Sequence, residues 1–247
     1  MRKLFIEQAD AVCILTGDDH KHLSLVLRAK RGDTVAVSTG DGFDYTYTVD
    51  SISARETILK KTRFVPNETE PFLSLTLFSA VLKGDKNDTV VRMCTELGVA
   101  CIIPFTGEYT VATKDSCKVE RLQKIALEAA KQSGRGRVPK ICAPLTFDRL
   151  VEKLPEYELA VFPFERARDT DIKTFLRVAF DKPCGGGGKK MSIAAIVGGE
   201  GGFSESEAAR LQAFGVIPVT LGRRILRADT ACAAVCALIL YEAGEMK

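Results

Sequence analysis

The segment Ile196-Val-Gly-Gly-Glu-Gly-Gly-Phe-Ser204 and the later segment Leu221-Gly-Arg-Arg-Ile-Leu-Arg-Ala-Asp-Thr230 are the most informative parts of this chain. Each is an apolar run that leads into a glycine-containing loop and then into a predicted helix. Because ligands of α/β proteins bind at the carboxyl edge of a parallel sheet, we expect both loops to lie side by side at that edge. Four glycines within five residues of the first loop let the backbone approach a ligand where a Cβ would obstruct it. The second loop carries three arginines, so the pair predicts a small-molecule site beside an anionic partner.

The first loop does not match either common nucleotide-binding fingerprint. A Walker loop ending at Gly188-Lys189 would need a glycine in place of Pro183 and a serine or threonine in place of Lys190. A GxGxxG pattern that began at Gly199 would need a glycine in place of Ser204. Any nucleotide-like ligand is therefore expected to be held by a different loop chemistry.

Composition is that of an ordinary globular protein. The 247 residues allow one large domain or two modest ones, and 46% of them are hydrophobic. The longest apolar run, residues 231–240, is too short for a membrane span. The N-terminal residues lack the apolar core of a signal peptide, so we expect a cytoplasmic protein. A net charge of +3 indicates nothing by itself about nucleic acid.

The cysteines and histidines form no recognisable metal or disulfide pattern. The chain has eight cysteines but no CxxC pair, and its two histidines lie near the N-terminus. Cys232 and Cys236 are one helical turn apart in an apolar run, where a free cysteine behaves as a small hydrophobe. We therefore expect reduced and mostly buried thiols.

The sequence divides into two regions with different patterns. Residues 1–70 contain short segments rich in β-branched and aromatic residues, which predict a small β-barrel: 33–38, 43–52 and 56–64. Residues 66–71 have the composition of a linker, so we place the domain boundary there. In residues 71–247, apolar strands alternate with amphipathic helices, which predicts an α/β fold with a largely parallel sheet; the expected strands are 73–82, 99–105, 159–164, 193–198 and 216–221.

Several residues are expected at helix ends. Gly98 is placed to end a helix over residues 90–97, and Ser204 and Glu207 match a capping box at the start of another. Asp229 or Thr230 is expected to cap the last helix.

Glu200 and Arg227 are the candidate functional side chains of the two loops. A turn into a capped helix would require only one or two glycines, so the four around Glu200 favour a ligand site. Glu200 is expected either to accept hydrogen bonds from the ligand or to orient the second loop. Arg227 lies between an apolar pair and the helix cap and is expected close to the ligand, whereas Arg223 is more typical of a solvated face.

Basic segments elsewhere predict contact with RNA. In Ser133-Gly-Arg-Gly-Arg137, arginines separated by glycine suit bidentate contacts to phosphates, although a basic connecting loop is the alternative. Residues 20–31 predict a basic helix on the barrel, in which His22 contacts a base or phosphate or else is a surface or capping histidine.

Four ordered motifs in this chain resemble those of the RsmE family, the 16S rRNA (uracil(1498)-N(3))-methyltransferases of the SPOUT superfamily. The resemblance covers almost the whole chain. Besides the two loops, the motifs are His22-Leu-Ser-Leu-Val-Leu-Arg28 with Gly32-Asp33, Lys83-Gly-Asp-Lys86 continuing to Cys94-Thr-Glu-Leu-Gly-Val99, and Gln123-Lys-Ile-Ala-Leu-Glu-Ala-Ala-Lys-Gln-Ser-Gly-Arg135 with Arg137-Val-Pro139.

This resemblance implies a PUA-like RNA-binding domain over residues 1–70 and a SPOUT methyltransferase domain with a C-terminal trefoil knot over 71–247. It also implies a homodimer, S-adenosyl-L-methionine as the methyl donor, and 16S rRNA or the 30S ribosomal subunit as the partner. The implied cofactor-binding residues are Phe162, Val197, Gly198, Gly199, Glu200, Gly201, Gly202, Leu221, Gly222, Ile225, Leu226 and Arg227. The expected RNA-binding residues are His22, Arg28, Lys83, Arg121, Lys124, Ser133, Arg135 and Arg137.

The chain departs from the usual family pattern at two positions. The family usually has proline in place of Gly199 and often has glutamate in place of Asp229, so the first loop is expected to be less rigid and a cap or contact to differ. The catalytic hypothesis is that Arg227 stabilises the negative charge that develops on uracil, while Glu200 orients the cofactor or the substrate. The alternatives are a SPOUT enzyme for another RNA or ribose position, or a non-catalytic RNA-binding factor.

Overall fold

The computed structural model describes residues 3–111, 117–181 and 190–246. The chain forms two compact units, which we call the N-terminal and C-terminal units. The N-terminal unit consists of Met1–Glu70 and Ala130–Val138, and the C-terminal unit of Pro71–Ala129 and Pro139–Lys247. None of the described helices has the length and apolar composition that a membrane span requires.

The N-terminal unit contains a five-stranded sheet in the order β1-β3-β4-β5-β2. All neighbouring strands pair antiparallel except β1 and β3, which are parallel. The fully buried Val37, Tyr47 and Leu59 form the centre of its core, as expected for strands rich in β-branched and aromatic residues. Its elements are β1 (Leu4–Phe5), β2 (Val12–Leu15), α1 (Gly17–Lys21), the π-helix η1 (His22–Val26), β3 (Thr34–Ser38), β4 (Phe43–Ile52) and β5 (Thr57–Pro66).

The basic helix predicted over residues 20–31 is much shorter than expected. Helical structure ends at Val26, and Arg28 adopts a left-handed backbone conformation with φ of 51°. A non-glycine residue in this conformation interrupts a right-handed helix, so Lys30 and Arg31 do not continue it. His20, in the last turn of α1, is buried, and its Nδ1 lies 2.9 Å from the hydroxyl of Thr57.

The segment Ala130–Val138 belongs to the N-terminal unit, although the sequence places it in the second region. Lys3 donates a hydrogen bond to the carbonyl of Gly134 over 2.7 Å, and Ser38 donates one to the carbonyl of Gly136 over 2.8 Å. These bonds join residues about a hundred positions apart, which no local pattern reveals.

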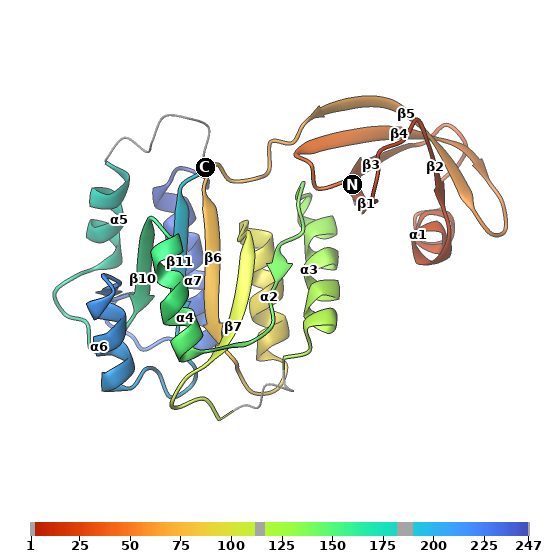
Figure 1. The fold of residues 1–247 in the computed structure, drawn as a ribbon. Helices are drawn as coiled ribbons and strands as arrows, with labels where there is room; N and C mark the ends of the chain where they lie inside the picture. The colour runs from red at the N-terminus through yellow and green to blue at the C-terminus, as the bar shows by residue number, and fades with distance from the viewer. Residues whose placement is uncertain (1–2, 112–116, 182–189, 247) are drawn as a thin grey trace. The chain divides into compact units, whose positions relative to one another are not determined.

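The C-terminal unit is built on a seven-stranded parallel sheet, as the sequence predicted (Figure 1). Six strands follow the order β12-β10-β11-β6-β7-β8, and β9 pairs with β7 beyond the end of β8. The strands are β6 (Ser74–Ala80), β7 (Cys101–Thr106), β8 (Lys140–Ile141), β9 (Leu145–Thr146), β10 (Leu159–Pro163), β11 (Ser192–Val197) and β12 (Ile217–Val219).

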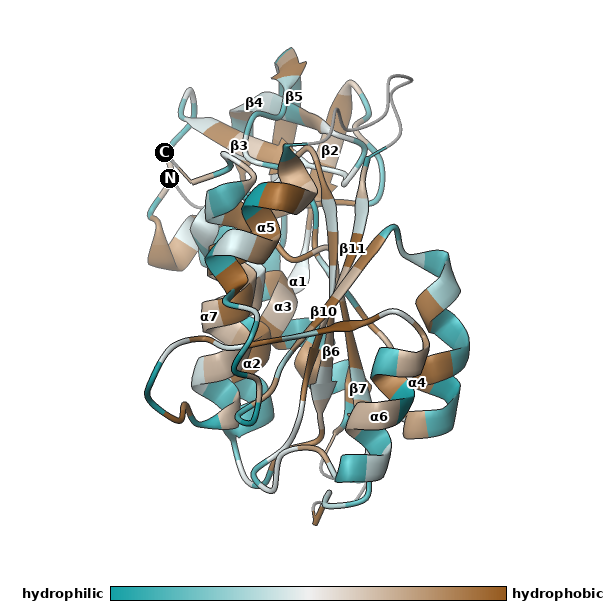
Figure 2. Cartoon of the chain, turned by 90° about the vertical axis from the view of Figure 1, so that its left-hand side faces the viewer, coloured by the Kyte–Doolittle hydropathy of each residue, from teal (hydrophilic) through white to brown (hydrophobic). Residues whose placement is uncertain are grey.

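Helices cover both faces of this sheet, so its strands are apolar throughout (Figure 2). Helices α4 and α6 lie on one face, and α2, α5 and α7 lie on the other (Figure 2). Gly98, with φ of 110°, ends α2 as predicted. The helices are α2 (Lys86–Leu97), α3 (Val119–Ser133), α4 (Phe147–Lys153), the 3-10 helix η3 (Leu154–Glu156), α5 (Ile172–Phe180), α6 (Glu205–Ala213) and α7 (Ala228–Glu242).

The start of α7 differs from the prediction. Arg227 is the N-cap residue, and its side chain makes no capping hydrogen bond. Its carbonyl oxygen accepts a hydrogen bond from the Ala231 amide at 2.8 Å, so α7 begins at Ala228, earlier than a cap at Asp229 or Thr230 allows. Asp229 instead lies in the first turn, where a negative charge favours the helix dipole.

Candidate active site

The strand order brings the glycine loop and the arginine loop to one edge of the sheet, but not next to each other. The glycine loop follows β11 and the arginine loop follows β12, and β10 lies between these two strands. Neighbouring strands are about 4.8 Å apart, so the two loops begin roughly 10 Å from one another. The loop that follows β10 separates them, which corrects the expectation that they lie side by side.

The glycine loop is a tight turn closed by its own backbone. The Gly202 amide donates a hydrogen bond to the Gly199 carbonyl over 3.0 Å, and Gly202 has φ of 67°. The predicted capping box follows directly, with the Ser204 side chain accepting from the Glu207 amide and Glu207 accepting from the Ser204 amide. The other carboxylate oxygen of Glu207 accepts from the Glu108 amide at 2.8 Å, which fixes the loop after β7 against the base of this turn.

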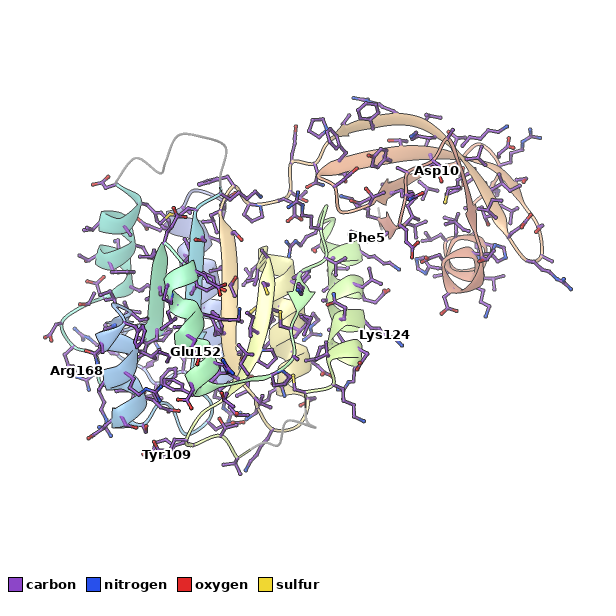
Figure 3. The ribbon with its side chains drawn as sticks, in the orientation of Figure 1. Phe5, Asp10, Tyr109, Lys124, Glu152 and Arg168 are labelled. Atoms are coloured by element: carbon purple, nitrogen blue, oxygen red, sulfur yellow. The ribbon has the colours of Figure 1, made fainter. Side chains whose placement is uncertain are left out.

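Three of the four glycines are required by the protein itself, two by close packing and one by its backbone conformation. A Cβ on Gly198 would lie 3.0 Å from the carbonyl carbon of Gly202, and one on Gly201 would lie 2.8 Å from the Cβ of Tyr109. Tyr109 extends from the loop after β7 (Figure 3). Gly202 is required by its positive φ. Gly199 alone has space, because its Cβ would meet the Cβ of Ala80 at an ordinary 3.5 Å.

Alanine substitutions at Gly199 and Gly201 should therefore have different effects on stability. We expect Gly201→Ala to force the turn away from Tyr109, lowering stability by about 1–3 kcal/mol, as overpacking typically does. Gly199→Ala should leave stability nearly unchanged, because its Cβ meets only an ordinary contact. Thermal denaturation of both variants measures the difference, and equal melting temperatures would contradict the close packing of Gly201 on Tyr109.

Glu200 is held by the first turn of α2 rather than by the arginine loop. Its carboxylate accepts a hydrogen bond from the Lys86 ammonium at 2.7 Å and one from the Lys83 amide at 3.4 Å. Partial burial acts against ionisation of Glu200, but these hydrogen bonds lower its pKa below the ordinary value. Glu200 is therefore an ionised, paired carboxylate, which suits orientation of the loop and makes it a poor proton acceptor.

Sequence reasoning did not select Lys86 or Tyr109 as site residues. Lys86 ends the quoted motif Lys83-Gly-Asp-Lys86, so the motif itself carried the signal. Tyr109 has no local pattern that indicates contact with a loop far away in the sequence.

The arginine loop is fixed by its backbone and leaves its cations unpaired. The Thr220 hydroxyl accepts from the Gly222 amide at 3.2 Å, and the Thr220 amide donates to the carbonyl of Thr170 in the loop after β10. Ile225 is 87% exposed. Within the described ranges, three exposed arginines of this loop have no side-chain hydrogen bond or ion pair: Arg223, Arg224 and Arg227.

The other predicted cofactor residues present either their backbone or partly exposed apolar side chains at the candidate site. Phe162 is fully buried, with its ring centroid 5.5 Å from that of Phe203, so its side chain belongs to the core and only its backbone lies near the strand end. Val197, the last residue of β11, is also buried. Leu221 and Leu226 are half-buried.

In the C-terminal unit, the predicted RNA-binding residues are exposed. Lys83 lies in the loop after β6, next to Glu200. Arg121 and Lys124 lie on α3, where Arg121 forms an ion pair with Asp88.

In the N-terminal unit, the predicted RNA-binding residues divide into exposed and buried groups. Arg28 and Arg137 are exposed, whereas His22 and Ser133 are half-buried. Arg135 is only 3% exposed, and its guanidinium donates to both carboxylate oxygens of Glu70 at 3.1 and 2.8 Å. This placement argues against the predicted RNA contact of Arg135, because its donors already serve a buried ion pair.

The cysteines beneath the site behave as hydrophobic residues. Cys94, Cys232 and Cys236 are fully buried between α2 and α7, and the seven cysteines in the described ranges are free thiols. Burial raises the pKa of Cys232 well above its ordinary value, so this thiol stays protonated at neutral pH.

Known proteins share the fold and much of the sequence of this chain. Residues 68–240 match a family model described as an RNA methyltransferase domain, so the chain is an RNA methyltransferase by class. The ribosomal RNA small subunit methyltransferase E of Bacillus subtilis is 30% identical over 98% of this chain and 94% of its own length. The protein of the same name from Synechocystis is 34% identical over 90% of this chain and 70% of its own length.

A solved structure agrees with the sequence comparisons. The ribosomal RNA small subunit methyltransferase E of Neisseria gonorrhoeae, bound to S-adenosyl methionine, has a TM-score of 0.84 and 25% identity, with 98% of this chain and 97% of that chain covered. The present chain therefore belongs to the ribosomal RNA small subunit methyltransferase E family.

The carboxyl edge of the sheet fits S-adenosylmethionine in its chemistry. This cofactor carries an ammonium, ribose hydroxyls and an adenine amine, all of which donate hydrogen bonds. Asp229 Oδ1 is buried and lacks a partner in the described part of the chain, so one acceptor remains for such a donor. The glycine turn adds backbone that a ligand can approach closely.

Proposed function

We propose that this protein transfers a methyl group from S-adenosylmethionine to N3 of a uridine in 16S rRNA, the position given by the uracil(1498)-N(3) specificity of the RsmE family. The observation that carries the proposal is the unpaired Arg227 at the start of α7, one strand away from the glycine turn. An exposed cation at the same edge of the sheet as a loop that suits a cofactor favours methyl transfer to an anionic substrate such as RNA.

When bound, S-adenosylmethionine supplies a methyl group on a positively charged sulfur. The N3 proton would pass to solvent water, and N3 would then take the methyl group while the sulfur leaves as a neutral thioether. Neutral uracil is a poor nucleophile, so the protein must favour the anion that remains after this proton has gone. The Arg227 guanidinium is suited to hydrogen-bond the oxygen on which that charge develops.

Glu200 has a supporting role in this proposal. Its ion pair with Lys86 ties the glycine turn to α2, so this turn keeps a fixed geometry where it meets the cofactor. Its lowered pKa leaves it ionised at neutral pH and gives it little tendency to take the N3 proton.

The pH dependence of the reaction should therefore be independent of Glu200. Above about pH 6 a carboxylate with a lowered pKa stays ionised, and turnover should rise with pH as the N3 proton leaves more readily. Glu200→Gln should change the rate while keeping this profile. Initial rates measured across neutral and alkaline pH provide the check, and an inflection that disappears in Glu200→Gln would identify Glu200 as the base instead.

The finer features of the family also belong to this proposal. The C-terminal segment forms a trefoil knot, supported by the path of α7, which follows the edge strand β12 yet packs against β11 and β6. The N-terminal unit is a PUA-like RNA-binding domain, supported by its mainly antiparallel five-stranded sheet. The protein is a homodimer, supported by the exposed Leu238 and Tyr241 on α7, and it acts in the cytoplasm.

The exposure of the remaining basic side chains supports their assignment to RNA contacts. In the proposed complex, Arg28, Lys83, Arg121, Lys124 and Arg137 contact phosphates of the RNA, with His22 and Ser133 near its path.

Labelled S-adenosylmethionine tests this function directly. The protein is incubated with the labelled cofactor and, in separate reactions, with 30S subunits, free 16S rRNA or tRNA, and the labelled nucleoside is then identified. We expect 3-methyluridine at one position of 16S rRNA. A methyl group on ribose, on another base or only on tRNA would replace the proposed target, and no transfer to any substrate would favour a non-catalytic RNA-binding factor.

A further inference from the structure

Three aromatic side chains lie together on the sheet of the N-terminal unit. Tyr45 of β4 and Phe64 of β5 face each other across the two strands, and Phe43 lies two residues from Tyr45 on the same face. The Phe64 ring centroid is 5.9 Å from that of Phe43 and 6.2 Å from that of Tyr45. We call these three residues the aromatic platform.

The aromatic platform is open to solvent. Phe64 is 62% exposed and Phe43 is 38% exposed, whereas Tyr47, farther along the same face of β4, is fully buried. Cross-strand aromatic pairs stabilise a sheet, but that role does not require a phenylalanine with most of its surface in water. A cluster of exposed apolar rings is typical of a surface that binds a partner.

The charges around the platform favour an anionic partner. The Lys61 ammonium lies 5.6 Å from the centre of the Tyr45 ring. An Arg137 guanidinium nitrogen lies 3.7 Å from the place where a Cβ on Gly42 would stand, next to Phe43 in the chain. Arg137 is exposed and its side chain has no partner within the described ranges, so its charge is available to a ligand.

The acidic groups near the platform are already hydrogen-bonded. Asp41 accepts from the Tyr45 hydroxyl and from the Phe43 amide. Asp44 pairs with Lys3 at 2.7 Å and also accepts a hydrogen bond from the side-chain Nδ2 of Asn67 at 2.9 Å. Asp41 thus holds Tyr45 and the Phe43 backbone in place as an ionised carboxylate, and Lys3 balances the charge of Asp44. With Lys61 and Arg137 against Asp41, the rim keeps a net positive charge, which favours an anionic partner.

We propose that the aromatic platform stacks unpaired bases of a single-stranded RNA segment, with Lys61 and Arg137 contacting its phosphates. Aromatic rings stack on any base, and basic side chains beside them follow the phosphate backbone, so this surface provides affinity without reading a sequence. The proposal rests on the proposed function for the identity of the RNA. It assigns the capture of single-stranded substrate mainly to three aromatic residues that no motif of the family indicated.

Fluorescence anisotropy with a labelled single-stranded RNA of about 10 nucleotides, and with a duplex of the same length, tests this surface. We expect the wild-type protein to prefer the single strand. Phe43→Ala combined with Phe64→Ala should weaken single-strand binding by about tenfold or more, since each stacked base contributes on the order of tenfold. Phe64→Ala alone should also weaken binding, whereas Phe64→Tyr should bind as tightly as the wild type, because tyrosine keeps the aromatic ring.

The matched control is Ile14→Ala on β2 of the same sheet, an apolar side chain that is 57% exposed. It should leave RNA affinity unchanged. A measurement on the wild-type protein removes any dependence on variant folding, because 2-aminopurine placed in the single strand should be quenched when it stacks on the platform. Unchanged affinity of the double variant, or unquenched 2-aminopurine in the wild-type complex, would overturn the proposal.

Two further results distinguish this proposal from others. If the double variant keeps its RNA affinity but changes its mass in solution, the platform is a contact between protein subunits and the RNA proposal is wrong. Methyl transfer to 16S rRNA is measured in parallel with saturating cofactor. If the wild-type protein methylates rRNA and the double variant binds RNA normally, the proposed function is supported and only the platform proposal is wrong.

Discussion

Replacing Arg227 with alanine is expected to reduce turnover by about 100- to 1,000-fold, the cost of removing one donor from an anion-stabilising site. The fold should be unaffected, because the Arg227 side chain is exposed and caps α7 only through its backbone. Affinity for S-adenosylmethionine should change little, since the guanidinium is assigned to the base and not to the cofactor. Single-turnover rates measure the first effect, and the rise in melting temperature with added cofactor measures the second.

Arg223→Ala is the matched control for this prediction. Arg223 lies in the same loop, is equally exposed and also lacks a side-chain partner in the described residues. Its removal should lower RNA affinity slightly and leave the rate at saturating RNA unchanged. Near-normal turnover of Arg227→Ala, or an equal loss in both variants, would mean that the loop supplies general positive charge and that Arg227 has no special role.

Arg135→Ala is expected to lower the stability of the N-terminal unit by about 3–5 kcal/mol, because it leaves the buried Glu70 carboxylate without its cation. One Glu70 oxygen also accepts from the amides of Gly136 and Arg137 at 3.0 Å each, so Glu70→Ala should cost at least as much. Chemical denaturation followed by hydrogen exchange in this unit measures the change.

Arg137→Ala provides the comparison, since Arg137 is two residues away in the same motif but exposed. Its effect on stability should stay within about 0.5 kcal/mol, as is usual for surface positions, while its RNA affinity falls. Full stability together with weakened RNA binding in Arg135→Ala would restore the original prediction that Arg135 contacts RNA.

The α/β architecture was predictable because its signals are local. Strands buried on both faces appear as continuous apolar runs, and β6, β7, β10 and β11 all lie within a few residues of the predicted positions. The capping box at Ser204 and the glycine that ends α2 are short-range patterns with a fixed geometry. The family motifs located the two loops because these motifs are also short, local stretches of sequence.

The parts that were not predictable depend on contacts between distant residues. The pairing of Glu200 with Lys86 joins positions 114 apart in the sequence. Gly201 is needed because it packs on Tyr109, which is also distant in the sequence. An arginine between glycines has the same local appearance whether it faces a phosphate or a buried Glu70, so the sequence could not separate Arg135 from Arg137. The predicted basic helix was wrong because helical structure ends at Val26 and Arg28 takes a left-handed conformation.

The return of Ala130–Val138 to the N-terminal unit makes that unit a discontinuous piece of the chain. Cutting the chain after Glu70 would not release a self-sufficient module, because Lys3, Ser38 and Glu70 would each lose the partner that this segment supplies. An ancestral or engineered transplant of the RNA-binding part would have to carry both pieces.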